Sequence, residues 1–285
     1  METEVVSAPV LGPRDEFSLK RVFRTYAEFV RVGFVNTLAY RLRYYTGIAT
    51  YFIYVSVYYF IWKAIYAHST SIAGFNFPQL LTYVALGWII RSFYYNNIDQ
   101  DIATQVLEGK LAMDLIKPVN PQWMYIAQAL GESVFRLVML TAPTAIILLL
   151  VYPVRGPASR GHFLAFLVSA TLSFFLVAAI NFAIGTFAIR LKSILGLLRA
   201  KYFFLELFSG LLIPISFFPH VFQTALAFMP FQYISYIPVL LYLGKINGSG
   251  IIEALAVQIF WVAAMVAIGH GLWAWSTRRI TIQGG

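Results

Sequence analysis

Long apolar runs alternate with short polar segments along this chain. Six runs are long enough to predict membrane-crossing helices, because a span needs about 20 mainly apolar residues. Each of them contains at most two charged residues. The pattern therefore predicts an all-α integral membrane protein with six transmembrane helices. The predicted spans are residues 46–67, 78–98, 122–152, 162–189, 202–218 and 251–275.

The stretch between the last two spans is apolar but does not have the pattern of a simple span. Proline removes a backbone donor and clashes with the preceding helical turn. Irregular backbone exposed to lipid is not tolerated either. We therefore predict a re-entrant pair of short helices within an extracytoplasmic segment, residues 219–244, and the alternative is a seventh span that places the C-terminus outside. Pro230 and Pro238 interrupt the stretch, after Pro214 and Pro219.

The N-terminal segment contains an amphipathic pattern. Arg21, Arg24 and Arg31 recur at helical spacing, and Val22, Tyr26, Val30 and Gly33 fall on the opposite face. A basic amphipathic helix beside a span typically lies along the cytoplasmic headgroups. We predict such an interfacial helix within a cytoplasmic N-terminal segment, residues 1–45, before a transmembrane domain at 46–285. A solvated helix packed on another domain is the alternative.

Composition supports a membrane protein. Of 285 residues, 60% are hydrophobic and only 12% are charged, whereas a soluble domain carries about 25% charged residues. An ordinary soluble enzyme of this size is therefore excluded. The chain has no cysteine, which excludes disulfides, iron–sulfur clusters and cysteine-ligated zinc.

The distribution of basic residues predicts the orientation. The net charge is +9, and 16 of the 21 Lys and Arg residues fall on one side of the six predicted spans. That set includes Arg14, Arg41, Lys192 and Arg279. Cytoplasmic loops carry an excess of Lys and Arg, so both termini are predicted to face the cytoplasm.

Motifs for catalysis and nucleotide binding are absent from the sequence. The Gly-Lys pairs at Gly109 and Gly244 lack the surrounding phosphate-binding loop of a Walker A motif. No HExxH or GxSxG motif occurs, and the four histidines are far apart. We therefore expect no enzyme activity, no metal site and no cofactor bound by this chain.

Three charged residues lie well inside predicted spans, where an ionisable group usually faces protein or water. Glu132 and Arg136 are four residues apart and share a helix face. They form either a pair that holds helices together or part of a pathway or dimer interface. For Glu206 the alternatives are an ion pair across helices with Arg91 or Arg136, or a position lining a cavity. Asn181 is expected to hydrogen-bond a neighbouring helix.

Aromatic residues make up 17% of the chain. Most lie near predicted span ends, as expected for interfacial belts. Because ring faces attract cations, an aromatic pathway for hydrophobic or cationic molecules is the alternative, with Trp88 and Tyr94 as its first candidates.

The loop DQDIATQVLEGKLAMDLIKPVNP at residues 99–121, with the proline-punctuated stretch that ends near Gly244, resembles the permeases of ABC-2-type ABC transporters. The resemblance implies a membrane subunit that works as a homodimer or heterodimer with two separate ABC ATPase chains. ATP and magnesium would then bind the partner ATPase, consistent with the missing Walker motif. The resemblance also implies that the short helices of residues 220–243 cap the outer end of the pathway.

In such permeases a short helix of the first cytoplasmic loop docks on the ATPase. Here the resemblance places that coupling helix near residues 102–114, with residues 190–201 as a weaker second contact. A surface helix that merely caps the span is the alternative. The expected contacts comprise an apolar side, Ile102, Val106, Leu111 and Leu115, and the charged residues Glu108, Lys110 and Asp114.

Together these features predict a permease subunit of an ATP-driven exporter in the inner membrane of a prokaryote. Its expected substrates are hydrophobic or amphipathic compounds, including drugs, moved by alternating access. An ion-coupled secondary transporter and a non-transporting membrane scaffold are the alternatives. Nucleic acid is not an expected partner, because topology and headgroup contacts account for the positive charge.

Overall fold

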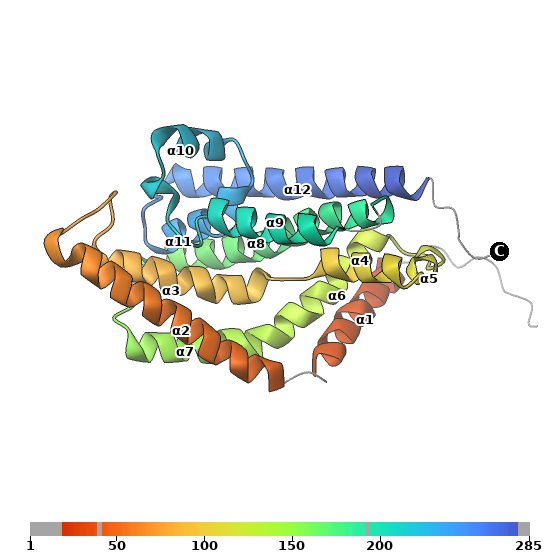
Figure 1. Ribbon diagram of the computed structural model, residues 1–285, viewed down its shortest axis with the longest axis horizontal. Helices are drawn as coiled ribbons and strands as arrows, with labels where there is room; N and C mark the ends of the chain where they lie inside the picture. The colour runs from red at the N-terminus through yellow and green to blue at the C-terminus, as the bar shows by residue number, and fades with distance from the viewer. Residues whose placement is uncertain (1–18, 39–41, 192–193, 279–285) are drawn as a thin grey trace, which may run out of the picture.

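A computed structural model describes residues 19–38, 42–191 and 194–278 (Figure 1). Within those ranges the chain forms helices and turns, and no β-strand, so the all-α prediction is confirmed. Parts of the predicted N-terminal segment and of the C-terminal tail lie outside the described residues. So do four residues of the orientation argument, Arg14, Arg41, Lys192 and Arg279.

Four helical stretches in the described ranges are long and apolar enough to cross a membrane, and they match the first, third, fourth and sixth predicted spans. The first is α2 (Leu42–Ile65). The third joins α6 (Pro121–Arg136) to α7 (Ala142–Val151). The fourth and sixth are α8 (Arg160–Gly185) and α12 (Ser249–Thr277).

The second predicted span is a shorter helix than expected. It is α3 (Phe77–Tyr94), whose 18 residues extend about 27 Å. Asn76 begins it with a capping box, in which the Gln79 backbone N–H donates to the Asn76 carboxamide oxygen at 3.0 Å. The chain leaves the helix at Tyr95, before the predicted end at residue 98.

The predicted bounds of the fifth span, residues 202–218, are wrong. The helix α9 (Leu195–Phe208) begins earlier and ends ten residues earlier. Gly210 follows it with a φ of +79°, a conformation that ends helices and favours glycine. With 14 residues α9 extends about 21 Å. The count of six spans therefore stays a prediction.

The proline-rich stretch after α9 contains a pair of short helices, as expected. They are α10 (His220–Ala227) and α11 (Tyr236–Tyr242). Single 3-10 turns at Ile215–Phe217 and Phe231–Tyr233 connect them to the rest of the chain. Figure 1 shows α10 at the end of the molecule opposite α4 and α5.

The loop predicted to form one coupling helix contains two helices instead. They are α4 (Ile98–Leu107) and α5 (Leu111–Leu115). Gly109 lies between them with a φ of +70°, so the helix cannot continue through it. The expected continuous helix over residues 102–114 is therefore corrected to a helix, a turn and a single further helical turn.

The helices pack in two layers around α3 (Figure 1). On one side α12 packs along α8, and α9 and α11 belong to the same side. On the other side α2 packs against α3 and α7. The beginning of α1 (Leu19–Leu38) and the end of α12 lie at the same end of the molecule as α4 and α5.

The helix α1 packs closely along α6. A β-carbon on Gly33 would lie 2.0 Å from the Gln128 carbonyl oxygen, and one on Gly131 would lie 1.9 Å from the Val30 carbonyl oxygen. Glycine therefore permits a backbone-to-backbone contact at both positions. The face of α1 containing Val30 and Gly33, expected to be its membrane face, is partly used for this packing, while Phe23, Val32, Val35 and Leu38 are exposed.

Candidate functional site

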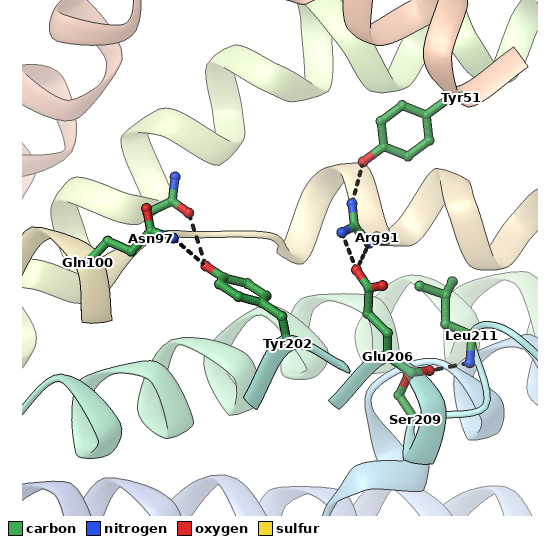
Figure 2. Close-up of polar contacts among 8 residues, drawn as sticks. All are labelled: Tyr51, Arg91, Asn97, Gln100, Tyr202, Glu206, Ser209 and Leu211. Atoms are coloured by element: carbon green, nitrogen blue, oxygen red, sulfur yellow. Dashed lines mark hydrogen bonds and ion pairs between the residues drawn. The ribbon is translucent and has the colours of Figure 1, made fainter. Parts of the chain in front are cut away.

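An ion pair between Arg91 and Glu206 connects α3 to α9 (Figure 2). The Arg91 guanidinium donates from Nε to Glu206 Oε1 at 2.8 Å and from Nη1 to the Tyr51 hydroxyl at 3.0 Å. Of the partners that the sequence offered for Glu206, the structure uses Arg91. The pair joins α9 to α3, and Tyr51 extends the contact to α2.

Further polar contacts join α9 to the break after α3 and to the first turn of α4. The Tyr202 hydroxyl donates to Asn97 Oδ1 at 3.2 Å and accepts from the Gln100 side chain at 3.4 Å. One residue earlier, the Lys201 ammonium donates to the Asp99 carboxylate. We refer to the contacts Arg91–Glu206, Asn97–Tyr202 and Asp99–Lys201 as the polar ladder.

The Asp99–Lys201 contact is the most buried part of the polar ladder. The two side chains are 0% and 5% exposed. Lys201 also donates to Asn181 Oδ1, and the Asn181 amide donates to Asn96 Oδ1, both at 2.9 Å. The expected hydrogen bond of Asn181 to a neighbouring segment is therefore present. The network fixes the first turn of α4 against both α8 and α9.

The second predicted charge pair also forms. Arg136 Nη2 lies 3.3 Å from Glu132 Oε2 within α6. The Arg136 guanidinium also lies 5.7 Å from the centre of the Tyr95 ring, and that of Arg91 lies 5.1 Å from it. Tyr95, in the break between α3 and α4, therefore contacts both buried guanidinium groups.

A polar cavity of about 440 Å³ lies beside these pairs. This volume falls within the range of small-molecule sites. Side chains of α1, α2, α3, α4 and α6 line it together with the break after α3. A second cavity of about 340 Å³ shares Asn36, Asp101 and Glu132 with it. The lining residues of the polar cavity are Asn36, Thr37, Tyr44, Gly47, Tyr51, Arg91, Ser92, Tyr95, Asn97, Asp101, Glu132, Arg136 and Leu140.

The two aromatic pathway candidates do not line this cavity, although the Trp88 ring lies 5.6 Å from that of its lining residue Tyr51, measured between ring centres. Trp88 is buried and stacks on Tyr54, with ring centres 4.7 Å apart. Tyr94 is buried as well. Neither residue belongs to the lining of the polar cavity, where Tyr51 and Tyr95 are found instead. The placement of Trp88 and Tyr94 on a transport pathway stays a prediction.

Among the cavity-lining residues outside the membrane-spanning helices, Asp101 has the most strongly shifted pKa. Desolvation, with the neighbouring Glu132 and Asp99 carboxylates, raises the pKa of Asp101 to about 7, although the residue keeps an exposed surface. Its side chain also meets the open space of both cavities, so water there screens part of the effect. The charge of the cavity therefore changes near neutral pH.

We expect Asp101→Asn to change the pH dependence of stability. The raised pKa means that the folded wild type holds a proton more tightly than the unfolded chain, so its stability falls as pH rises from about 4 to about 7. The variant does not lose stability in this way, so its free energy of unfolding should rise relative to that of the wild type as the pH increases over that range. Unfolding midpoints measured across the range, with Glu108→Gln as a control for losing one exposed carboxylate, check it. Parallel curves for wild type and Asp101→Asn would contradict it.

The residues predicted to contact an ATPase divide into two groups. Ile102, Leu111 and Asp114 are buried, and Asp114 accepts hydrogen bonds from Lys117 at 2.7 Å and from Tyr125 at 2.6 Å. Val106 is half-buried. Glu108 and Lys110 are partly exposed and pair with each other at 2.6 Å. Three members of the predicted apolar side therefore face the protein, whereas the fourth, Leu115, is exposed. The other exposed apolar residues here are Leu107, Met113 and Ile116.

The basic residues predicted for the interfacial helix are exposed. Arg21, Arg24 and Arg31 all lie on the outer side of α1, and Arg31 pairs with Glu28 at 3.2 Å. Sequence reasoning missed Asp99, Asp101 and Lys201, because their positions next to polar loops made them look like ordinary solvent-facing charges.

Comparison with known proteins gives one family. The family model described as "ABC-2 family transporter protein" matches residues 52–284, which cover most of the chain and both cavities' α3, α4 and α6 walls. No curated protein matches the chain.

Proposed function

Because the chain belongs to the ABC-2 transporter family, we propose that it is the permease subunit of an ATP-driven exporter. Two copies, identical or related, form the translocation pathway and bind two separate ABC ATPase chains. ATP binding and hydrolysis on those partners drive alternating access. The expected cargo is a hydrophobic or amphipathic compound, including drugs.

The surface of α4 and α5 is the observation that best supports an ATPase partner. Leu107, Met113 and Ile116 are 74%, 64% and 78% exposed around the turn at Gly109. Exposed apolar groups gathered beside charged ones are typical of protein interfaces. We call Leu107, Met113, Leu115 and Ile116 the docking surface. Glu108 and Lys110 lie between its members and offer charges of both signs.

The polar ladder offers a route from the docking surface into the membrane. Asp99 lies in the first turn of α4, and its contact with Lys201 ties that helix to α9. Eight residues before Asp99 and five residues after Lys201, Arg91 binds Glu206. If the ATPase displaces α4, these contacts therefore pass the movement to α9 and to α3. Arg91 and Asn97 also line the polar cavity, so the movement reaches that cavity.

The proposed topology has six spans with both termini in the cytoplasm of a prokaryotic cell. The ends of the described chain lie at the same end of the molecule as α4 and α5 (Figure 1). The excess of Lys and Arg predicted for that side supports the same orientation. In this arrangement α10 and α11 lie at the outer side as the re-entrant pair.

Both rival functions have less support. An ion-coupled transporter needs an intramembrane carboxylate that is available to bind a proton or sodium ion. Glu132 and Glu206 are each paired with an arginine, which favours a structural role for both. A scaffold without transport does not account for cavities lined by charged and aromatic side chains.

Purification with a candidate ATPase tests the proposed function. We expect the two chains to co-purify and to show vanadate-sensitive ATP hydrolysis in lipid. Stable isolation with no ATPase, together with transport driven by a proton gradient, would defeat the proposal.

We expect alanine substitution of Leu107 and Ile116 together to weaken ATPase binding by about tenfold or more, because truncating a residue at the centre of an interface can cost about 2 kcal/mol. Both side chains are exposed, so folding should be unaffected. Binding is measured by co-purification at graded ATPase concentrations. The control is Leu150→Ala, a leucine that is 81% exposed on α7. Equal binding by all three proteins would remove this surface from the interface.

A further inference from the structure

An apolar groove opens on the outside of the molecule between α1 and α6. Its volume is about 630 Å³. The groove is separate from the polar cavity, and none of its lining residues is charged. Its walls include Phe23, Ala27 and Val30 of α1, Trp123 and Leu130 of α6, and Phe175 of α8.

The lining fits a hydrocarbon chain better than a polar ligand. Only Tyr26 and Trp123 contribute polar side-chain atoms to the lining. The Tyr26 hydroxyl accepts a hydrogen bond from the Asn120 backbone N–H at 3.3 Å, so it serves the start of α6. A ligand in this groove gains affinity by removing apolar surface from water or from mobile lipid.

Helical spacing along α1 places basic residues beside one edge of the groove, at Ala27. Lys20, Arg24 and Arg31 share a stripe of α1 with Ala27, at spacings of three and four residues. All three side chains are exposed, and Arg31 is paired with Glu28. No ion pair of Lys20 or Arg24 occurs among the described residues. Two cationic groups therefore stand beside an apolar groove, an arrangement complementary to a negatively charged amphiphile.

We propose that the groove binds an anionic phospholipid of the cytoplasmic leaflet. One acyl chain lies between α1 and α6 against Trp123, and the phosphate lies at Lys20 and Arg24. The cytoplasmic leaflet is rich in anionic lipid, which basic segments attract. The inference rests on the proposed placement of α1 at the cytoplasmic face of the membrane, but it needs no ATPase and no transport.

Tryptophan quenching by brominated lipid tests this site. The full chain is placed in phosphatidylcholine vesicles that contain an equal fraction of either dibrominated phosphatidylglycerol or dibrominated phosphatidylcholine. The chain has six tryptophans, so the signal of Trp123 is obtained by difference from Trp123→Phe. We expect the anionic lipid to quench Trp123 at least about threefold more than the neutral lipid, because basic side chains attract anionic headgroups.

Matched variants separate the two parts of the site. Lys20→Gln with Arg24→Gln should abolish the preference for the anionic lipid, whereas Arg199→Gln with Arg278→Gln, two exposed basic residues elsewhere, should keep it. Ala27→Phe fills the groove and should reduce quenching by both lipids. Its unfolding midpoint, compared with wild type, shows whether the fold is intact.

The failing outcomes are distinct. Equal quenching by both lipids in the wild type indicates ordinary boundary lipid and overturns the proposal, as does a preference that survives the loss of Lys20 and Arg24 charges. Because ATP hydrolysis is not part of this measurement, either result leaves the proposed permease function standing. Conversely, a chain that binds no ATPase but keeps its preference for the anionic lipid would contradict the proposed permease function and leave the lipid site standing.

Discussion

Lys201→Met should destabilise the protein by about 3–5 kcal/mol, because removal of one partner leaves the other charge buried and uncompensated. Asp99 is 0% exposed and receives the Lys201 ammonium. Its second oxygen has no hydrogen-bond partner among the described residues. The unfolding midpoint in detergent or lipid should fall markedly, with a matching fall in the amount of folded protein.

The double variant Asp99→Asn with Lys201→Met should recover most of that loss. Replacing a whole buried ion pair is often nearly neutral, since both desolvation costs disappear together. Arg199→Met is the matched control, because Arg199 is an exposed basic residue on the same helix, where substitutions usually change stability by about 0.5 kcal/mol or less. Equal destabilisation by Arg199→Met and Lys201→Met would show that the buried contact carries no special energy.

The same variants address coupling. If the polar ladder transmits motion from α4 to α9, the double variant should fold normally and bind the ATPase while its transport falls relative to its ATP hydrolysis. The docking surface is untouched in that protein. Normal transport by the double variant would assign the Asp99–Lys201 contact to stability alone.

Apolar run length predicted the long spans well, because the membrane requires about 20 apolar residues for each crossing. The helices that deviate are those ended by local backbone signals. Gly109 and Gly210 adopt positive φ. Gly210 follows the end of a helix that hydrophobicity extended too far, and Gly109 divides the coupling helix that the family resemblance implied. Gly210 carried a readable signal, since a glycine after an apolar run commonly ends a helix.

The contacts of the polar ladder were beyond what local patterns encode. Arg91 and Glu206 are 115 residues apart, and Asp99 and Lys201 are 102 residues apart. The choice of Arg91 over Arg136 for Glu206 depends on which helices are neighbours. A pairing within one turn, such as Glu132 with Arg136, was predictable because helical spacing alone places the two residues on one face.

The burial of Ile102 and Leu111 shows the same limit. Their spacing indicates an apolar side for the predicted coupling helix, but amphipathicity does not say whether that side meets this protein or a partner. In the structure Ile102 packs against α8, where Gly185 allows α4 to come close. Leu115 of the predicted apolar side is exposed, and so is Ile116, which the prediction did not include.

Gly131→Ala should be among the most disruptive single-methyl additions in the described chain. The added β-carbon would lie 1.9 Å from the Val30 carbonyl oxygen and 2.8 Å from the Phe34 backbone nitrogen. Both obstacles are backbone atoms, so α1 and α6 must separate. Overpacking of this kind costs about 1–3 kcal/mol, and more when backbone has to move. The unfolding midpoint should therefore fall clearly, and Gly33→Ala should have a similar effect.

Local detachment of α1 distinguishes this prediction from a general loss of stability. Separation of α1 from α6 should speed tryptic cleavage at Arg21, Arg24 and Arg31, all exposed on α1, before the rest of the chain is cut. Gly271→Ala on α12 is the control, because a β-carbon there meets no atom within 4 Å. That change should stabilise the helix by about 0.5–1 kcal/mol. The close packing at Gly33 and Gly131 also holds together α1 and α6, the two walls of the apolar groove. Unchanged cleavage of Gly131→Ala would therefore show that α1 is held by other contacts. The groove would then have a different second wall.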